Sequence, residues 1–354
     1  MTLEKMDRYL RGLEASDAFS GVVRVTVGDD ERFAGAYGLA SRAWRARNTL
    51  ETRFDTASIT KLFTAVATLQ QVDAGAFGLE TRAVGYLDLE GTAISPEVTV
   101  RHLLTHTSGI GDDADEEAGE SYEAIWQTRP NYSVLKTADF LPQFVHRPPN
   151  FAPSQGCRYN NCGYVLLGLM IERATGRPYR DVVREDVFTP AGMSDSDFLR
   201  VDRVNERLAE GSNPIHDDAG TIVGWKRNIY SYPPIGSPDA GADVTAADLD
   251  RFLRAVRDGR LLSAELTAAF LAPQVVYKVR DGWTQHFGYG PSYRVEIDGA
   301  LVFLEKEGIN PGVSGVVRHY PGRDLTVVML SNLEQGVWDP IRVAHEMVLA
   351  GAFD

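Results

Sequence analysis

The sequence predicts an α+β fold in which helices flank an antiparallel sheet built from both ends of the chain. Apolar and polar residues alternate at 21–27 and 33–37, a pattern typical of strands. Comparable patterns return only after Gly288, whereas helical segments and loops rich in Pro, Asp and Gly occupy about 87–240. The early and late strands are therefore expected to complete one sheet, with an all-α region inserted between them.

This pattern predicts two domains. The first is a discontinuous α/β domain of residues 1–86 and 241–354, and the second is a mainly helical domain of residues 87–240. The length of 354 residues exceeds the usual size of one simple domain. A hydrophobic fraction of 44% is ordinary for a globular protein and allows a substantial core.

The first predicted elements are an amphipathic helix over 3–15 and a hairpin of strands 21–27 and 33–37, turning at Gly28-Asp29-Asp30. Further along the chain, periodicity predicts helices at 59–72, 161–175, 179–187, 245–256 and 339–350, and strands at 292–297, 301–304, 315–320 and 325–330. The late strands read as antiparallel neighbours.

Turn and cap residues bound several of these elements. Gly75 and Gly176 follow predicted helices, and glycine readily takes the left-handed conformation that ends a helix. Thr245-Ala246-Ala247-Asp248 resembles a capping box, with Asp in place of Glu or Gln. Pro321-Gly322-Arg323-Asp324 is a turn that joins the last two strands.

The tetrapeptide Ser58-Ile59-Thr60-Lys61 opens the helix that ends at Gly75 and carries the first candidate chemistry. Residues three apart lie on one helix face, so the Lys61 amine lies beside the Ser58 hydroxyl. A hydroxyl at its free pKa is a weak nucleophile and needs such a base. The alternative is an ordinary N-cap followed by an exposed lysine, and the tetrapeptide alone favours that alternative.

Two further boxes follow in order: Tyr159-Asn160-Asn161, before the apolar run Tyr164–Ile171, and Lys306-Glu307-Gly308, directly after a predicted strand. Taken singly, each has a structural explanation: a packed loop tyrosine, a turn or N-cap asparagine, or a solvated lysine at a strand end. Their order after Ser58 and Lys61 favours a functional site over these explanations.

The surroundings of the three boxes resemble those of the serine β-lactamase-like superfamily. The matching segments are Phe54-Asp55-Thr56-Ala57, Leu103-Leu104-Thr105-His106-Thr107-Ser108-Gly109, Gly163-Tyr164-Val165-Leu166-Leu167-Gly168 and Asn310-Pro311-Gly312-Val313-Ser314. The resemblance runs from about Phe19 to Leu349. The tyrosine of the middle box is similar to that of the group holding class C β-lactamases, D-amino-acid peptidases and family VIII carboxylesterases. The resemblance implies the superfamily's fold, with an active site in the cleft between its two parts.

The resemblance also implies roles for single residues. The implied catalytic residues are Ser58, Lys61 and Tyr159, and the implied substrate-binding residues are Asn161, Lys306, Gly308 and Ile309. Ser58 would be the nucleophile, and its N–H and that of Ile309 would stabilise the oxyanion. Gly308 would allow close approach of substrate to the strand edge, and Asn161 would hold Lys61 and the acyl side chain.

Two pKa values must shift for these roles. Lys61 acts as a base or proton shuttle only if burial or a nearby cation, such as Lys306, lowers its pKa from about 10.4. The Tyr159 phenol would share the proton transfer, and the same two lysines can favour its phenolate form.

Glu307 departs from the superfamily's pattern, because many β-lactamases have a small hydroxyl residue there. A glutamate beside Lys306 would pair with it or repel a substrate carboxylate. It therefore weakly disfavours β-lactams and D-amino-acid peptides, which usually carry one. The effect is lost if the side chain points away from the cleft, as alternation along a strand allows.

No metal site or cofactor is expected. Cys157 and Cys162 flank the tyrosine box, and reduced thiols explain them better than a disulfide or a metal pair. His102 and His106 have i,i+4 spacing but lack the glutamate of H-E-x-x-H, so we expect them to cap or pack.

The net charge of −13 argues against nucleic acid and anionic membranes as partners. The sequence has no run of about 18 apolar residues and does not open on a secretory signal. We therefore expect a cytoplasmic protein, unless a leader has been removed. The oligomeric state is left open.

Three functions are compatible with these residues. The leading one is a serine esterase that acts on small or short-acyl carboxylic esters through an acyl-enzyme. The same residues also suit an amide hydrolase, namely a β-lactamase, a D-aminopeptidase or a D-amino-acid amidase, and the third possibility is a non-catalytic penicillin-binding-type scaffold. The expected partner is a small-molecule ester or amide. Loops at about 109–132 and 211–242 shape the acyl pocket, and their candidate lining aromatics are Tyr122, Trp126, Trp225 and Tyr230.

Overall fold

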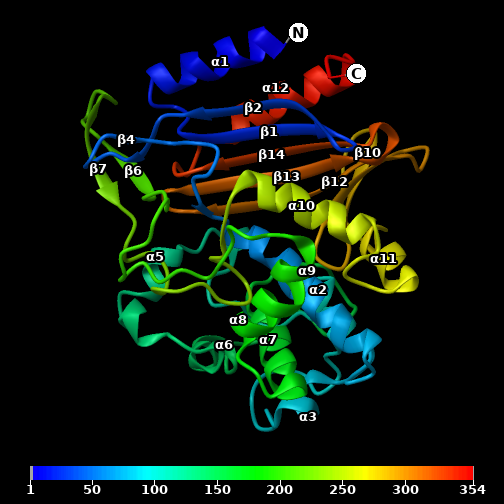
Figure 1. The fold of residues 1–354 in the computed structure, drawn as a ribbon. Coiled ribbons are helices and arrows are strands. Elements are labelled where there is room, and N and C mark those ends of the chain that lie inside the picture. Colours follow the sequence, from blue (N-terminus) through cyan, green and yellow to red (C-terminus); the bar gives the residue numbers. More distant parts are fainter. Residues whose placement is uncertain (1–2, 354) are drawn as a thin grey trace.

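The computed structural model describes residues 3–353 and confirms the predicted α+β fold. Its main sheet has eight antiparallel strands in the order β2-β1-β14-β13-β12-β11-β10-β9 (Figure 1). The early strand β1 (Gly21–Val27) pairs with the last strand, β14 (Leu325–Ser331), with Gly21 opposite Ser331. The two ends of the chain thus complete one sheet, as the sequence predicts.

The remaining strands extend this sheet or form small pairs. In the main sheet they are β2 (Asp30–Tyr37), β9 (Val275–Val279), β10 (Trp283–Phe287), β11 (Ser292–Glu296), β12 (Leu301–Asn310) and β13 (Val313–Tyr320). The small pairs are β3 (Leu39–Ser41) with β4 (Ala46–Arg47), β5 (Phe54–Asp55) with β8 (Asp243–Val244), and β6 (Ser212–His216) with β7 (Ile222–Arg227).

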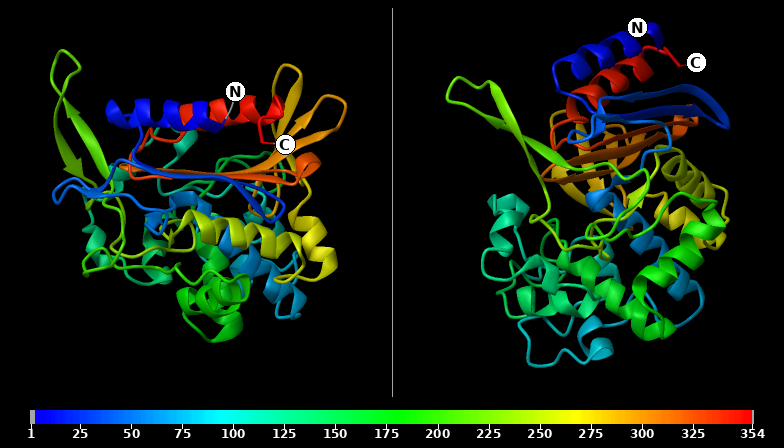
Figure 2. Two further views of the ribbon diagram at one scale, coloured as in Figure 1. Left: turned by 45° about the horizontal axis from the view of Figure 1, so that its top comes forward. Right: turned by 60° about the vertical axis from the view of Figure 1, so that its left-hand side comes forward.

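Helices cover both faces of the sheet (Figure 2). The terminal helices α1 (Leu3–Ala15) and α12 (Trp338–Leu349) lie on one face. On the other face, α10 (Ala246–Arg257) lies along the sheet, and α2 (Thr60–Asp73) runs from the sheet toward α7 (Cys162–Thr175) (Figure 1). The smaller helices are α3 (Ala83–Leu87), α4 (Val100–Leu104), α5 (Tyr122–Ile125), α6 (Leu141–Phe144), α8 (Tyr179–Val182), α9 (Thr189–Ala191) and α11 (Ala264–Phe270).

Strand β14 shows how the sequence fixes the two layers. Its side chains are buried on both faces of the sheet, which explains its nearly unbroken apolar sequence. Val327 and Met329 pack in the core below α1 and α12, whereas Val328 and Leu330 pack in the core around α2 and α7. A slip of one residue would exchange these two sets, so burial on both sides specifies the register.

Several predicted boundaries need correction. The helix expected from Ile59 begins at Thr60, after a 3₁₀ turn over Ala57–Ile59. Strand β12 continues to Asn310, so the third sequence box lies within the strand rather than after it. The helix predicted at 179–187 is divided between α8 and a π-helical stretch, Val183–Phe188.

Two hairpins, β6–β7 and β9–β10, are not predicted from the sequence. The β6–β7 hairpin lies inside the region expected to be all-α, and its residues are largely exposed, so it lacks a clear apolar alternation. Its turn is held by the Asp217 carboxylate, which accepts the N–H groups of Ala219 and Thr221. The β9–β10 hairpin lies at the sheet edge, where partial burial weakens the same signal. The division into domains at residues 86/87 and 240/241 stays a prediction.

Within residues 3–353, no helix has the length and apolar character that a membrane crossing requires.

Helix α10 begins where the sequence predicts, because the Thr245 hydroxyl accepts the N–H of Asp248 at 3.2 Å. The Asp248 carboxylate does not complete the capping box. It accepts instead the N–H of Asp195 and the hydroxyl of Ser196, each at 2.8 Å, and so joins that loop to the helix.

Replacing Thr245 by Ala should lower the free energy of unfolding by about 1 kcal/mol, because the helix loses its N-cap acceptor. Urea unfolding followed by circular dichroism measures the change. Thr245→Ser keeps the hydroxyl and removes only the buried methyl, so it is the matched control. Equal losses in the two variants would show that packing rather than capping is responsible.

Candidate active site

Ser58 lies in the 3₁₀ turn that leads into α2. The preceding residue, Ala57, has φ of +43°, in the left-handed region that residues other than glycine rarely adopt. The Asp55 carboxylate holds this turn by accepting the Ala57 N–H at 2.7 Å, and the Thr56 carbonyl accepts the Ile59 N–H at 3.0 Å. The strained turn is therefore stabilised on both sides of Ser58.

Lys61 is fully buried, and its Nζ contacts three acceptors. It lies 3.0 Å from Ser58 Oγ, 2.7 Å from Asn161 Oδ1 and 2.8 Å from the backbone carbonyl of Asp239. Burial lowers the pKa of Lys61, although the carboxylates of Asp239 and Glu116 oppose this shift. Burial rather than a neighbouring cation is thus the main reason that Lys61 can exist as the neutral amine, which can accept a proton.

Tyr159 lies on the other side of the nucleophile. Its hydroxyl is hydrogen-bonded to Ser58, and Lys306 Nζ lies 3.5 Å from the phenol oxygen. The amines of Lys61 and Lys306 lie 5.1 and 4.6 Å from the centroid of the Tyr159 ring. Burial nevertheless raises the pKa of Tyr159 well above its usual value. The expectation of a phenolate is therefore wrong for this arrangement, and Tyr159 carries a proton that it can donate.

Lys306 is buried on β12, opposite Val317 of β13. Burial and the positive charge of Lys61 lower the pKa of Lys306 to about 7. Glu307 is exposed and, within residues 3–353, makes no ion pair with Lys306. It still lines the cleft beside Lys306, where partial burial and the neighbouring Glu305 raise the pKa of its carboxyl to about 7.

Gly308 lies where β12 passes the turn that carries Ser58. A Cβ atom at this position would lie 2.1 Å from the Thr56 carbonyl oxygen and 3.2 Å from the Ser58 nitrogen. The close approach of strand and turn therefore requires glycine. Ile309 follows at the exposed edge of the strand. The assignment of the Ser58 and Ile309 N–H groups as oxyanion donors stays a prediction.

Asn161 is oriented by residues that the sequence analysis did not assign to the site. The Asp112 carboxylate accepts the Asn161 backbone N–H at 2.9 Å and its Nδ2 at 3.2 Å, and the Tyr122 hydroxyl accepts the same Nδ2 at 2.8 Å. These contacts leave Asn161 Oδ1 facing Lys61. Asp112 is therefore a positioning residue, and only the folded loop shows it.

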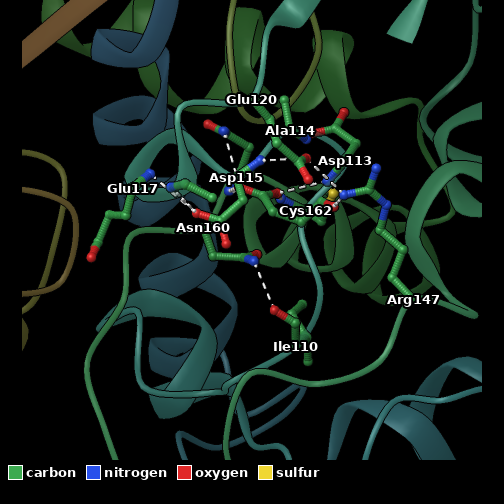
Figure 3. A network of polar contacts seen from close by, with 12 residues as sticks. Ile110, Asp113, Ala114, Asp115, Glu117, Glu120, Arg147, Asn160 and Cys162 are labelled. Atoms are coloured by element: carbon green, nitrogen blue, oxygen red, sulfur yellow. Dashed lines mark hydrogen bonds and ion pairs between the residues drawn. The ribbon is translucent and has the colours of Figure 1, made fainter. Parts of the chain in front are cut away.

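The two histidines pack and cap, as expected. His106 is buried with its ring 4.6 Å from that of Tyr159, and its Nδ1 accepts the Asn160 N–H. Asn160 in turn donates from Nδ2 to the Ile110 carbonyl at 3.0 Å (Figure 3). His102 completes a capping box at the start of α4. His106 thus supports one face of the tyrosine that contacts Ser58.

Two cavities meet at Ser58. The inner cavity is bordered by Asn161 and the loops around 113, 122–126, 199–201 and 231–243. The outer cavity is bordered by Tyr159 and β12 residues. We use the names inner cavity and outer cavity for these two spaces below.

Two of the four candidate lining aromatics, Tyr122 and Trp126, line the inner cavity. The other two lie elsewhere. Trp225 belongs to β7 and packs against the Arg42 guanidinium, and Tyr230 is 69% exposed. For these two residues the prediction of a pocket position is not supported.

Asp112, Asp113 and Cys162 are the candidate metal ligands among the described residues, with ligand atoms within 4.8 Å of one another. Asp113 and Cys162 lie beside Arg147 (Figure 3). Burial and the nearby carboxylates raise the pKa of the Cys162 thiol well above its usual value, which disfavours the thiolate that binds metals. Asp112 is already occupied by Asn161. The two cysteines are free thiols, and the expectation of a metal-free site stays a prediction.

Comparisons with known proteins give consistent matches. The sequence model of the family described as Beta-lactamase matches residues 6–352. Penicillin-binding protein 4* of Bacillus subtilis (strain 168) is 25% identical over 328 residues, which cover 90% of this chain and 69% of that protein. Esterase EstB of Burkholderia gladioli is 34% identical over 210 residues, covering 57% of this chain and 51% of that protein. The crystal structure of a penicillin binding protein from Bacillus halodurans has a TM-score of 0.87 at 36% identity, covering 96% of this chain and 99% of that one.

Replacing Gly308 by Ala should reduce turnover at Ser58 by about 100-fold or more, because the new Cβ would push β12 away from the nucleophile's turn. Initial rates with an activated ester measure the loss. Gly85→Ala is the control, since an added Cβ there meets no atom within 4 Å. Unchanged turnover in the Gly308 variant would show that the close approach is not needed.

Lys306 also predicts a pH dependence of stability. From its folded pKa of about 7 up to the ordinary lysine value, the unfolded chain binds more protons than the folded chain. The free energy of unfolding should therefore rise with pH across this window. In Lys306→Met we expect the rise between about pH 7.5 and about pH 9 to be smaller by up to about 2 kcal/mol. Urea unfolding at several pH values measures it.

Lys5→Met is the control for this experiment, because Lys5 is exposed on α1. This variant should keep the wild-type pH dependence. Equal pH dependence in Lys306→Met and in the wild type would contradict the lowered pKa of Lys306.

Proposed function

We propose that this chain, which belongs to the Beta-lactamase family, is a serine esterase for small or short-acyl carboxylic esters. The family and the fold make it a serine hydrolase of the penicillin-binding-protein type. The observation that carries the proposal is the 3.0 Å contact between Ser58 Oγ and the buried Nζ of Lys61. A buried amine with a lowered pKa is the base that a serine nucleophile needs.

The proposed reaction begins when Ser58 Oγ attacks the ester carbonyl and gives its proton to Lys61. Tyr159, which carries a proton, donates it to the leaving alkoxide, and the proton held by Lys61 then restores the phenol. Water attacks the acyl-enzyme, gives one proton to Lys61, and releases the acid as that proton returns to Ser58 Oγ. The N–H groups of Ser58 and Ile309 would stabilise the oxyanion in both steps.

Two observations support an ester over an amide substrate. Esterase EstB is similar to more than half of this chain. The acidic side chains of the outer cavity, among them Glu116 and Glu117, disfavour a substrate that carries a carboxylate.

An amide hydrolase remains the second candidate. The similarity to a penicillin binding protein at 36% identity favours it, because a serine that reacts with a penicillin is acylated by an amide carbonyl, that of the β-lactam ring. A non-catalytic scaffold is less well supported, since Ser58, Lys61, Tyr159 and Lys306 all lie together in the cleft.

Ser58→Ala and Lys61→Ala should each lower kcat/KM for p-nitrophenyl butyrate by at least about 1000-fold, because one removes the nucleophile and the other its base. Hydrolysis assays with circular dichroism of each variant test this. Ser133→Ala and Lys5→Ala, both at exposed positions, are the matched controls.

Wild-type turnover in Ser58→Ala would overturn the proposed nucleophile. The same assays with a chromogenic cephalosporin and a D-alanyl anilide compare ester with amide. Faster Ser58-dependent hydrolysis of either amide would keep the mechanism and replace the esterase by the second candidate.

A further inference from the structure

The titratable carboxylates that line the inner cavity are not matched by basic side chains. They are Asp55, Asp113, Asp239 and Asp243, and no Lys, Arg or His belongs to the described lining of this cavity. The outer cavity adds Glu116, Glu117 and Glu307 against two lysines, Lys278 and Lys306. The space around Ser58 is therefore lined by many more acidic than basic side chains.

These four aspartates differ from two buried aspartates elsewhere in the fold, which form ion pairs. Elsewhere, the buried Asp248 and Asp250 are each paired with an arginine, at 2.5 and 3.0 Å. Within residues 3–353, none of the four cavity aspartates has a basic nitrogen within ion-pair distance. Their described partners are neutral donors: the Asp239 carboxylate accepts the Ser237 hydroxyl at 2.6 Å, for example.

The four carboxylates come as two facing pairs. Asp55 and Asp243 lie opposite each other where β5 pairs with β8. Asp113 and Asp239 come from two loops that line the same cavity, and burial, Asp112 and Asp239 raise the pKa of Asp113 well above its usual value. Burial and Asp55 do the same for Asp243. A cation bound beside such a pair would favour its ionised form and would gain a carboxylate partner.

Two arginines approach these pairs from outside the cavity and do not neutralise them. Arg147 lies near Asp113, but it donates to the Asp112 carbonyl and to Glu120. Arg53 lies near Asp243, but its ion pair is with Asp195. A cation inside the cavity would therefore meet aspartates that form no ion pair with either arginine.

We propose that the inner cavity binds an acyl group that carries a positively charged amine, held between Asp113 and Asp239. The inference rests on the proposed function, because it names the substrates of the Ser58 reaction: esters of carboxylic acids that carry a positively charged amine. Asp239 is well placed for this role, since its carbonyl contacts Lys61 and its side chain lines the cavity. Tyr122 and Trp126 in the same wall offer aromatic faces to the cation.

The test compares two substrates of the same shape and different charge: the p-nitrophenyl esters of 4-(trimethylammonio)butanoic acid and of 5,5-dimethylhexanoic acid. In the wild type, kcat/KM for the charged ester should exceed that for the neutral ester by about tenfold or more. Asp239→Asn and Asp113→Asn should each bring this ratio severalfold closer to one. Asp218→Asn, an exposed position in the β6–β7 turn, makes the same change of charge and should keep the wild-type ratio.

The outcomes separate this inference from the proposed function. A wild-type ratio of one or less, with Ser58-dependent hydrolysis of the neutral ester, overturns the inference and leaves the esterase intact. The inference is also overturned if Asp239→Asn and Asp113→Asn both keep the wild-type ratio of kcat/KM for the two esters.

If neither ester is hydrolysed, the proposed esterase activity is wrong, and the inference is tested by ligand binding instead. Calorimetry on the wild type would then compare the amides of the two acids. Tighter binding of the charged amide, lost in Asp239→Asn, supports the inference, and equal binding of the two amides overturns it.

Discussion

The site depends on one unfavourable arrangement, the burial of the Lys61 amine beside the Ser58 hydroxyl. An ammonium in this position loses its hydration and gains only neutral hydrogen-bond acceptors, so burial shifts Lys61 toward the neutral amine. Burial acts in the same way on a second lysine and, together with Lys61, lowers the pKa of Lys306 to about 7. Tyr159, between them, keeps its proton because the phenolate would be buried as well. One physical cause therefore sets the protonation of all three groups, and it sets them in the sense that acyl transfer needs.

The rest of the fold serves to hold this arrangement in place. Ser58 comes from the 3₁₀ turn before α2, Lys61 from α2 itself, Tyr159 from the loop before α7, and Lys306 from β12, so neither face of the cleft is sufficient alone. The pairing of β1 with β14 joins the early strands to the same sheet as β12, the strand that approaches the Ser58 turn. At the point of approach only glycine fits, and Gly308 is there. The pairing of the two chain ends is thus a requirement of the site as well as of the core.

The fold and the groups at the centre of the site follow from the sequence, whereas the supporting groups do not. Ser58 and Lys61 are three residues apart, so helical geometry alone brings them together. The sheet is predictable because strands such as β14 are apolar throughout. The polar β6–β7 hairpin gives no such signal, since little of it is buried. The role of Asp112 cannot be predicted from the sequence either, because it depends on a loop that brings Asp112 to Asn161, 49 residues away in the chain.

The acidic cavity and the buried base are linked electrostatically. The carboxylates of Asp239, Glu116 and Asp113 raise the pKa of Lys61 and so oppose the effect of burial. A cation bound between Asp113 and Asp239 would offset these charges and, being positive itself, would favour the neutral amine further. The positive charge of the substrate would then favour the neutral form of Lys61, the base that activates Ser58. A neutral ester of the same shape fills the cavity without this effect, so discrimination between the two would act on the chemical step as well as on binding.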